Sequence, residues 1–294
     1  MKPGNTPLVE LRSFAPPGTQ LFAKLEWQNP TGSIKDRAAW FMFRNAQVKG
    51  LLRPGQPLIE ATSGNTGIGL ARLALIEGHP MVICLPRRST EERKLILRAY
   101  GAHLIEVDGG PNDAIAHAKQ LVADGEGHMC YQYGNRWNPY SHFFGTSLEL
   151  QREWPLDAPP SRLFAAYGTG GTLTGLSRGL KLAWSDLVVH GVQEHLDEPI
   201  GGMRSLDDPF QPPVADLALV SEWTTVTRAA AEGEVLGVMH SEGHFAGTSA
   251  GAVLLAARHR LSEVGGTAVA VLPDGGWKYL SGPPWQFPEA GPAA

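Results

Sequence analysis

Short apolar runs alternate with amphipathic segments along most of this chain, and glycine, proline or a capping residue marks most of the changes. Strands buried on both faces give such apolar runs, and the segments between them have helical periodicity. A chain of this kind folds as successive strand–helix units around a largely parallel sheet, so the expected fold class is α/β. Strands are expected at residues 21–25, 57–61, 81–85, 104–107, 163–167, 188–192 and 268–272.

Helices are expected at about 33–49, 70–77 and 89–101, and from the glycine-rich segment 168–172 to about residue 182. Ser33 is the expected N-cap of the first of these helices. Ser89, with Glu92 three residues later, predicts a capping box at the start of the third. The tail after Gly282 is rich in proline and alanine and is expected to be loose.

The composition excludes several classes of protein. The 294 residues are 43% apolar and 18% charged, which suits two domains, or one large α/β unit with a deep cleft. A net charge of −4 offers no attraction to nucleic acid or anionic lipid. With only Cys84 and Cys130, neither a disulfide framework nor a four-thiolate zinc site can form, which favours a reducing, cytoplasmic setting. No apolar leader or run of about 18 apolar residues occurs, so we expect neither export nor a membrane span.

Lys35 falls in the first turn of an expected helix, where the helix dipole disfavours a cation. Such a position lowers the pKa of the amine and favours the neutral form that a Schiff base with a carbonyl cofactor requires. The alternative is a solvent-exposed lysine whose charge is offset by Asp36. This residue by itself leaves both interpretations open.

Two glycine-containing segments are candidate anion sites. Thr62–Gly67 places hydroxyls, an amide and two glycines before a helix, which suits a carboxylate or phosphate, although a plain turn capped by Ser63 or Thr66 has the same composition. Gly168–Thr172 is richer in glycine, and phosphate is its expected ligand. It lacks the Gly-Lys-Ser/Thr of a Walker A loop, and Leu173 stands where a dinucleotide fingerprint needs its last glycine.

A further segment, Gly247–Gly251, matches the G-x-S-x-G pattern of serine hydrolases. Those enzymes need an acid and then a histidine downstream, yet no Asp or Glu lies between Ser249 and the last histidine, His259. Ser249 is therefore interpreted as a hydrogen-bonding hydroxyl. His240 and His244 have metal-like spacing, but no third ligand cluster accompanies them, and we expect no metal site.

Taken together, these segments resemble the cysteine synthase (O-acetylserine sulfhydrylase) family of fold type II pyridoxal-phosphate enzymes. The resemblance is carried by residues 4–8, 29–37, 62–67, 168–172, 247–251 and 273–281, which appear in the family's order. The stretch 200–204 is most similar to the B isoform. The resemblance implies a tryptophan synthase β-like fold with two three-layer αβα domains and the cofactor in the cleft between them. It further implies a smaller mobile domain at 37–140, a larger domain formed by 1–36 and 141–294, and a homodimer.

The resemblance also implies pyridoxal 5'-phosphate as cofactor, together with roles for individual residues. Lys35 would bind the cofactor covalently and then remove the substrate Cα proton. The other implied cofactor contacts are Asn65 to the ring oxygen, Gly168, Thr169, Gly170, Gly171 and Thr172 to the phosphate, and Ser249 to the pyridine nitrogen. A neutral hydroxyl at that nitrogen leaves the ring a weaker electron sink. The substrate carboxylate would be bound by Thr62, Ser63, Thr66 and Gln132. Arg204 would either bind a larger anion, such as thiosulfate or the phosphate of O-phosphoserine, or be a surface arginine beside Asp207 and Asp208.

The implied reaction is a β-replacement. O-acetyl-L-serine, or O-phosphoserine, loses its leaving group to give an α-aminoacrylate, and sulfide or possibly thiosulfate adds to give L-cysteine. A serine or threonine dehydratase, or a cystathionine-forming lyase, would share Lys35 and the phosphate loop. A non-enzymatic binding module and a nucleotide-dependent oxidoreductase are further alternatives.

Overall fold

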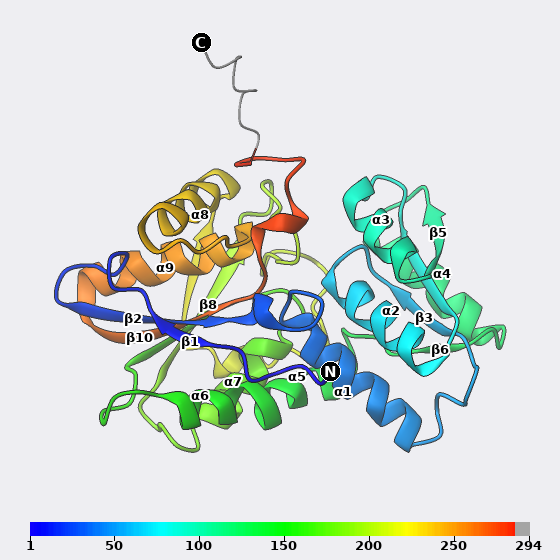
Figure 1. Cartoon of the computed structure of the whole chain (residues 1–294), viewed down its shortest axis with the longest axis horizontal. Helices are drawn as coiled ribbons and strands as arrows, with labels where there is room; N and C mark the ends of the chain where they lie inside the picture. The colour runs from blue at the N-terminus through cyan, green and yellow to red at the C-terminus, as the bar shows by residue number, and fades with distance from the viewer. Residues whose placement is uncertain (286–294) are drawn as a thin grey trace, which may run out of the picture.

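The strands of this computed structural model, which describes residues 1–285, form two separate sheets (Figure 1). The larger sheet has the order β1-β2-β10-β7-β8-β9, and only β1 runs antiparallel to its neighbour. Its strands are β1 (Leu8–Glu10), β2 (Thr19–Leu25), β7 (Arg162–Ala166), β8 (Val188–Glu194), β9 (Glu222–Val226) and β10 (Gly266–Leu272). Most of the tail that was expected to be loose, residues 286–294, lies outside the described residues.

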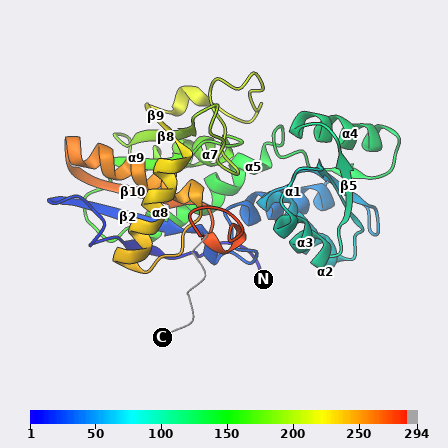
Figure 2. The same cartoon turned by 90° about the horizontal axis from the view of Figure 1, so that it is seen from above.

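The smaller sheet has the order β5-β4-β3-β6, and all its strands are parallel. It consists of β3 (Leu58–Ala61), β4 (Met81–Pro86), β5 (His103–Val107) and β6 (His128–Met129). The two sheets lie in separate halves of the molecule in Figure 2. Each takes its strands from one part of the chain, except that β1 and β2 join the larger sheet from the amino-terminal end.

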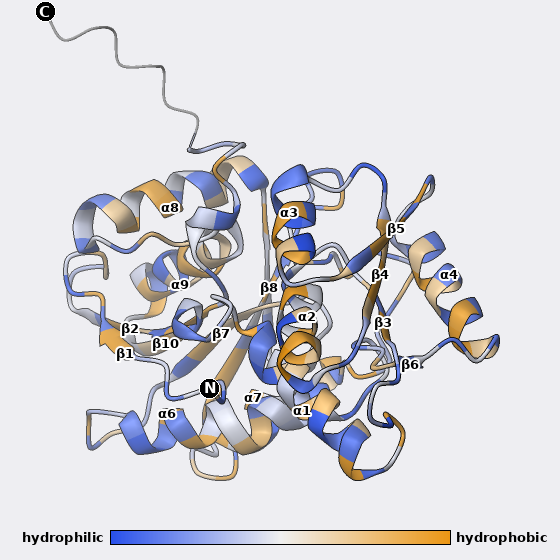
Figure 3. Ribbon diagram, turned by 45° about the vertical axis from the view of Figure 1, so that its right-hand side comes forward, coloured by the Kyte–Doolittle hydropathy of each residue, from blue (hydrophilic) through white to orange (hydrophobic). Residues whose placement is uncertain are grey.

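Helices cover both faces of each sheet. In the larger half, alternate residues of β10 pack in opposite directions. Ala268 and Ala270 belong to the core cluster of α9 (Thr248–Val264), whereas Val269 and Val271 belong to that of α7 (Gly171–Leu180). In the smaller half, one core cluster is shared by α1 (Lys35–Val48), α2 (Asn65–Glu77) and α3 (Glu91–Ala99), and α4 (Pro111–Ala123) contributes to another. The central strands of both sheets are accordingly hydrophobic in Figure 3. The α/β fold with two three-layer units is confirmed.

The helices are α1 (Lys35–Val48), α2 (Asn65–Glu77), α3 (Glu91–Ala99), α4 (Pro111–Ala123), α5 (Trp137–Ser141), α6 (Ser147–Glu153), α7 (Gly171–Leu180), α8 (Arg228–Glu242) and α9 (Thr248–Val264). Single turns of 3₁₀ or π type are η1 (Glu26–Gln28), η2 (His142–Thr146), η3 (Leu217–Leu219) and η4 (Gly276–Lys278). No helix in the part of the chain described is both long and apolar enough to cross a membrane.

Three local predictions are wrong. The N-cap of α1 is Ile34 and not Ser33, although the Ser33 hydroxyl accepts the Lys35 amide at 3.2 Å. The second helix begins at Asn65, five residues before the expected start, because Gly64 takes the extended N-cap conformation. The capping box of the third helix does not form, since Thr90 is the N-cap and no side chain caps it. The Glu92 carboxylate instead accepts hydrogen bonds from the Ser281 amide (2.9 Å) and hydroxyl (2.6 Å), which lie in the other half of the molecule.

Candidate active site

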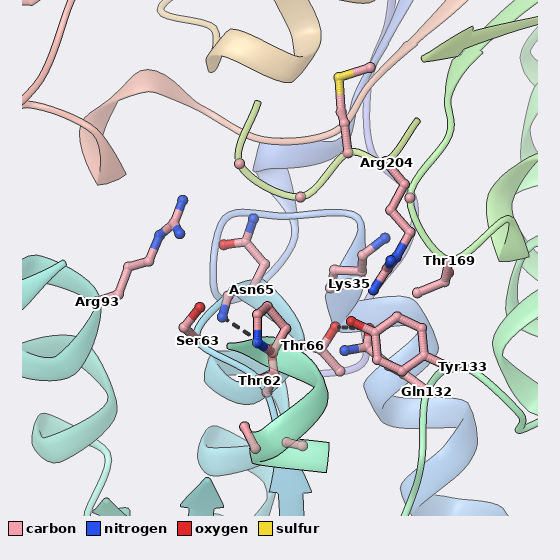
Figure 4. Close-up of a pocket in the computed structure, with 18 of the residues that line it drawn as sticks. Lys35, Thr62, Ser63, Asn65, Thr66, Arg93, Gln132, Tyr133, Thr169 and Arg204 are labelled. Carbon is pink, nitrogen blue, oxygen red and sulfur yellow. Dashed lines mark hydrogen bonds between the residues drawn. The ribbon is translucent and has the colours of Figure 1, made fainter. Parts of the chain in front are cut away.

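The carboxyl ends of strands from both sheets open onto one cavity of about 310 Å³. Open parallel sheets place ligands at this edge, because the loops after the strands converge there. The residues lining this cavity include Lys35, Thr62, Ser63, Asn65, Thr66, Gln132, Gly168, Thr169 and Arg204 (Figure 4). A narrower cavity of about 40 Å³ shares Lys35, Asn65 and Gly168 and adds Thr172 and Ser249. Gly170 and Gly171 line neither cavity.

Lys35 is the first residue of α1, and the end of the larger sheet holds it in place. A bridge joins Ser33 to Asp274, and the Ile34 amide donates to the Pro273 carbonyl at 2.8 Å. The Lys35 amine points into the cavity and has no hydrogen-bond or ion-pair partner among the described residues. Burial lowers its pKa, and the charge of Asp274 opposes that shift. The site therefore favours the neutral form of the Lys35 amine and leaves that amine available to a ligand.

The alternative interpretation of Lys35 depended on Asp36, which the structure engages elsewhere. The Asp36 carboxylate accepts hydrogen bonds from the Thr31 amide at 2.9 Å and from the Thr31 hydroxyl at 2.7 Å. Asp36 is buried, and burial raises its pKa. It therefore secures the turn before α1 and does not pair with Lys35.

The Thr62–Gly67 segment forms the start of α2, where the first N–H groups have no acceptor within the helix. The Thr62 hydroxyl accepts the Gly64 amide at 3.0 Å. The Thr66 hydroxyl donates to the Gln132 side-chain oxygen at 2.7 Å, which leaves the Gln132 amide nitrogen as a donor. Hydroxyls, backbone amides and a side-chain amide thus gather on one side of the cavity, as a carboxylate requires.

Asn65 is held by two residues of the carboxy-terminal segment. Its amide nitrogen donates to Asp274 Oδ2 at 2.8 Å, and its oxygen accepts from Lys278 Nζ at 2.8 Å. A carboxylate can only accept and an ammonium can only donate, so these two partners fix the orientation of the amide. Asp274 also accepts from the Tyr279 hydroxyl at 2.5 Å and, at a longer 3.4 Å, from Ser249.

The sequence interpretation gave no role to Asp274 or Lys278. Asp274 is 1% exposed and Lys278 is 5% exposed, and burial lowers the pKa of the Lys278 amine. Both residues belong to a segment that contributed to the family resemblance. The sequence signal was the presence of charged residues directly after a buried strand, but their contacts with Asn65 depend on the tertiary fold.

The Gly168–Thr172 segment joins β7 to α7 and leaves no room for larger side chains. A Cβ on Gly168 would lie 2.3 Å from the Gly202 carbonyl oxygen, and one on Gly171 would lie 2.2 Å from the Asn138 side chain. Gly170, at φ +77°, needs the left-handed conformation that glycine adopts readily. The glycines thus let this segment pack tightly against its neighbours, and Gly168, Thr169 and Thr172 bring the amino end of α7 to the cavities, where an anion is favoured.

His142 supports this loop and was not singled out from the sequence. Its Nε2 lies 3.2 Å from the Thr172 hydroxyl, and its Nδ1 lies 3.0 Å from the Thr146 hydroxyl. Burial holds its pKa well below the usual value, and the nearby charges of Arg37 and Lys35 add to the effect. A neutral His142 thus orients Thr172 without adding charge.

Arg204 lines the cavity and is also paired. Its Nη1 lies 2.6 Å from Asp208 Oδ2, and its side chain is 13% exposed. Arg93, which sequence analysis did not identify, lines the same cavity, with its guanidinium carbon 5.3 Å from the centre of the Tyr279 ring. The two halves of the molecule therefore each supply one arginine.

The end of α8 and the segment after it, which carry His240 and His244, make structural contacts. Glu242 accepts hydrogen bonds from the Ser13 amide at 2.6 Å and the Phe14 amide at 3.0 Å. The His244 ring packs beside Trp27. Within residues 1–285, no group of three His, Cys, Asp or Glu side chains is arranged to hold a metal ion.

Comparison with known proteins gives matches over nearly the whole chain. The family model described as pyridoxal-phosphate dependent enzyme matches residues 1–274. Cysteine synthase B of Salmonella typhimurium is 38% identical over 282 residues, covering 95% of this chain and 92% of that protein. Cysteine synthase B of Escherichia coli is 36% identical with the same coverage.

Solved structures agree with this result. O-ureido-L-serine synthase superposes with a TM-score of 0.91 at 31% identity, covering 96% of this chain and 92% of that one. O-acetyl serine sulfhydrylase isoform 3 from Entamoeba histolytica gives a TM-score of 0.89 at 31% identity, covering 99% and 92%. The matched region of the family model includes Lys35, both glycine-containing loops, Ser249 and Asp274.

Proposed function

Because this chain belongs to the cysteine synthase family of pyridoxal-phosphate-dependent enzymes and most resembles the B isoform, we propose that it forms L-cysteine from O-acetyl-L-serine and sulfide. The observation that carries the proposal is the Lys35 amine, which has no partner within residues 1–285. It shares the main cavity with donors suited to a carboxylate and with Gly168 and Thr169, which directly precede α7. These are the groups that an amino-acid substrate and a phosphorylated aldehyde cofactor require.

The residues of the site fit pyridoxal phosphate. The Lys35 amine is free to bind an aldehyde, and the narrow turn at Gly168–Thr172 offers the amino end of α7 to a phosphate. Ser249 lines the narrower cavity and offers a hydroxyl to the ring nitrogen. When bound, the cofactor supplies an aldehyde that condenses with amines and a ring that withdraws electrons from the substrate Cα.

In this proposal Lys35 has two tasks. Its amine holds the cofactor, and after the substrate amine displaces it, Nζ accepts the proton from the substrate Cα. Burial suits the second task, because the lowered pKa leaves more of the amine neutral near pH 7. Asn65 has one amide hydrogen committed to Asp274 and one left to donate to the ring oxygen of the cofactor.

The substrate carboxylate is proposed to bind at the start of α2. Thr62 and Ser63 supply hydroxyls and backbone amides there, Thr66 supplies its backbone amide, and Gln132 supplies its amide nitrogen. Because Thr66 and Gln132 are already hydrogen-bonded to each other, a carboxylate meets donors that are held in place before it arrives. Such preorganisation lowers the entropy cost of binding.

We also propose that residues 37–140 form a smaller, mobile domain and that the rest of the chain forms the larger one. The separate four-stranded sheet supports this division. Helix α2 of the smaller domain carries Asn65 and Thr66, whereas Ser249 and Asp274 belong to the larger half. Movement of the smaller domain would therefore open and close the site around a substrate.

The chain is further proposed to act as a homodimer in the cytoplasm. Phe144 and Leu148 are 52% and 54% exposed and border a cavity near the amino terminus, and these two exposed apolar side chains suit contact with a second copy. The two buried free thiols, Cys84 and Cys130, suit a reducing compartment. Light scattering on the purified protein measures its mass, and the mass of one chain alone would contradict the dimer.

The decisive experiment follows the products of the purified, cofactor-loaded protein. With O-acetyl-L-serine and sulfide we expect L-cysteine and acetate in equal amounts. Pyruvate from serine, or cystathionine from homocysteine, would assign the chain to one of the other activities of this cofactor class. An absorption band of bound cofactor without turnover of any of these substrates would indicate a binding module.

Lys35→Ala tests the role of the lysine directly. We expect borohydride to fix the cofactor to the wild-type chain and not to this variant, as read by peptide mass spectrometry. Lys181→Ala, a change in a lysine outside the cavity, serves as the matched control. A fixed adduct on another lysine in the Lys35→Ala variant would refute the assignment.

A further inference from the structure

Arg204 is paired within its own loop. Its Nη1 lies 2.6 Å from Asp208 Oδ2, and the second carboxylate oxygen, Oδ1, accepts the Phe210 amide at 2.8 Å. Both oxygens of Asp208 are thus used by the loop that carries Arg204. The ion pair is a built-in feature of this loop and places a negative charge directly beside the guanidinium.

The position of the Arg204 side chain is fixed from several directions. Its guanidinium carbon lies 5.2 Å from the centre of the Tyr133 ring and 5.0 Å from that of Phe210. These two rings meet edge to face, with centroids 5.4 Å apart. The Arg204 amide donates to the Tyr167 carbonyl at 2.9 Å, which ties the loop to the end of β7. Arg204 therefore cannot easily swing away from Asp208 to meet a ligand.

A second carboxylate faces the same space. Glu194 lines the main cavity together with Arg204 and Asp208, and its Oε2 accepts the Ile200 amide at 2.5 Å. Around Arg204 the cavity wall therefore carries one guanidinium and two carboxyl groups, and Arg93 of the smaller half is a further cation of the same cavity. A dianion placed beside Arg204 would meet these acidic groups as well as the Arg204 cation, whereas an uncharged group would be affected little.

We propose that Asp208 determines the leaving-group specificity of the site: by neutralising Arg204, it excludes serine derivatives whose side chain ends in a dianion and favours an uncharged ester. This proposal rests on the proposed function. With the substrate carboxylate at the start of α2, the side chain lies in the cavity that Arg204 and Asp208 line. In either substrate the Cβ–O bond breaks and the electron pair leaves with the oxygen, as acetate or as phosphate. Only the phosphate ester carries two negative charges before departure.

The test compares two substrates in the cofactor-loaded protein. The value of kcat/KM is measured for O-acetyl-L-serine and for O-phospho-L-serine, each with sulfide, in the wild type, in Asp208→Asn and in Asp207→Asn. Asp207 is an exposed carboxylate one residue away with no contact to Arg204, so it controls for net charge. We expect Asp208→Asn to raise the ratio of phosphate to acetyl ester by at least about tenfold, because an opposing carboxylate is removed. Asp207→Asn is expected to stay within about twofold of the wild type.

A double variant tests whether the higher kcat/KM for the phosphate ester in Asp208→Asn depends on the Arg204 guanidinium. Adding Arg204→Met to Asp208→Asn is expected to abolish the gain for the phosphate ester. Asp208→Ser removes the charge and keeps an oxygen near the Phe210 amide, and it replaces Asp208→Asn if circular dichroism shows that the asparagine variant is unfolded. Equal ratios for the Asp208 and Asp207 variants, or a wild type that uses both esters equally well, would overturn the proposal. A wild type that makes no cysteine from O-acetyl-L-serine would instead refute the proposed function.

Discussion

Replacing Asp274 with asparagine is expected to weaken cofactor binding without changing the shape of the site. The carboxylate accepts two short hydrogen bonds on Oδ2, from Asn65 at 2.8 Å and Tyr279 at 2.5 Å. In Asp274→Asn these become bonds to a neutral amide, and each loses about 1 kcal/mol, the difference between hydrogen bonds to charged and to neutral partners. The sum is about 2 kcal/mol, which corresponds to a roughly thirtyfold higher Kd for the cofactor if the loss falls on the bound state.

The assay is a titration of cofactor-free protein with pyridoxal phosphate, followed by absorbance, alongside urea unfolding of the same samples. The titration measures the change in Kd, and the unfolding curves show how much of the loss is a loss of stability. Asp157→Asn changes an exposed carboxylate by the same chemistry and is the control. Wild-type values of both Kd and unfolding free energy in Asp274→Asn would refute the inference that this carboxylate holds Asn65 in place.

Three further variants test other parts of the structure. Burial raises the pKa of Glu60 to about 8. Between pH 4.5 and pH 8 the folded state therefore holds a proton that the unfolded state has lost, so the free energy of unfolding falls as pH rises. Glu60→Gln should remove this pH dependence, as measured by urea unfolding from pH 5 to 8. Burial works to raise the pKa of Glu149, but hydrogen bonds from Arg37 bring it down to about 2. The contribution of Glu149 to stability is therefore present above pH 4.5 and lost as pH falls toward 2. Glu149→Gln should lower the free energy of unfolding by about 3 kcal/mol at pH 7, and an unchanged loss of stability at acid pH would contradict this. Thr66→Val removes the hydrogen bond to Gln132 and should raise KM for O-acetyl-L-serine by on the order of tenfold, whereas an unchanged KM would place the carboxylate elsewhere.

Buried strands could be predicted from the sequence, whereas short and edge strands could not. Every expected strand is present, because a short, continuous apolar run bounded by turn residues, such as that of β10, is typical of a buried strand. β1 and β6 have three and two residues, too few to show a pattern. β9 lies at the edge of its sheet and has the mixed sequence EWTTV, which periodicity does not separate from a loop.

The residues of the candidate site likewise include some that the sequence could reveal and some that it could not. Lys35 and the two glycine-containing loops could be identified because their chemistry is local: each is a short segment at the start of a helix. Asp274 could not, since Asn65, which it holds, lies 209 positions away in the sequence. The failed capping box at Glu92 has the same cause, because its carboxylate is used by Ser281 of the other half and no local rule contains that partner.

The bridge between Ser33 and Asp274 joins segments from the early and late parts of the sequence directly beside Lys35. Lys35 is synthesised well before β10 and the carboxylate that follows that strand. Before the segment after β10 is in place, Lys35 lacks the enclosure that lowers its pKa, and Asp274 does not yet hold Asn65. The enclosed site is therefore complete only when this segment has packed against Ser33 and Asn65.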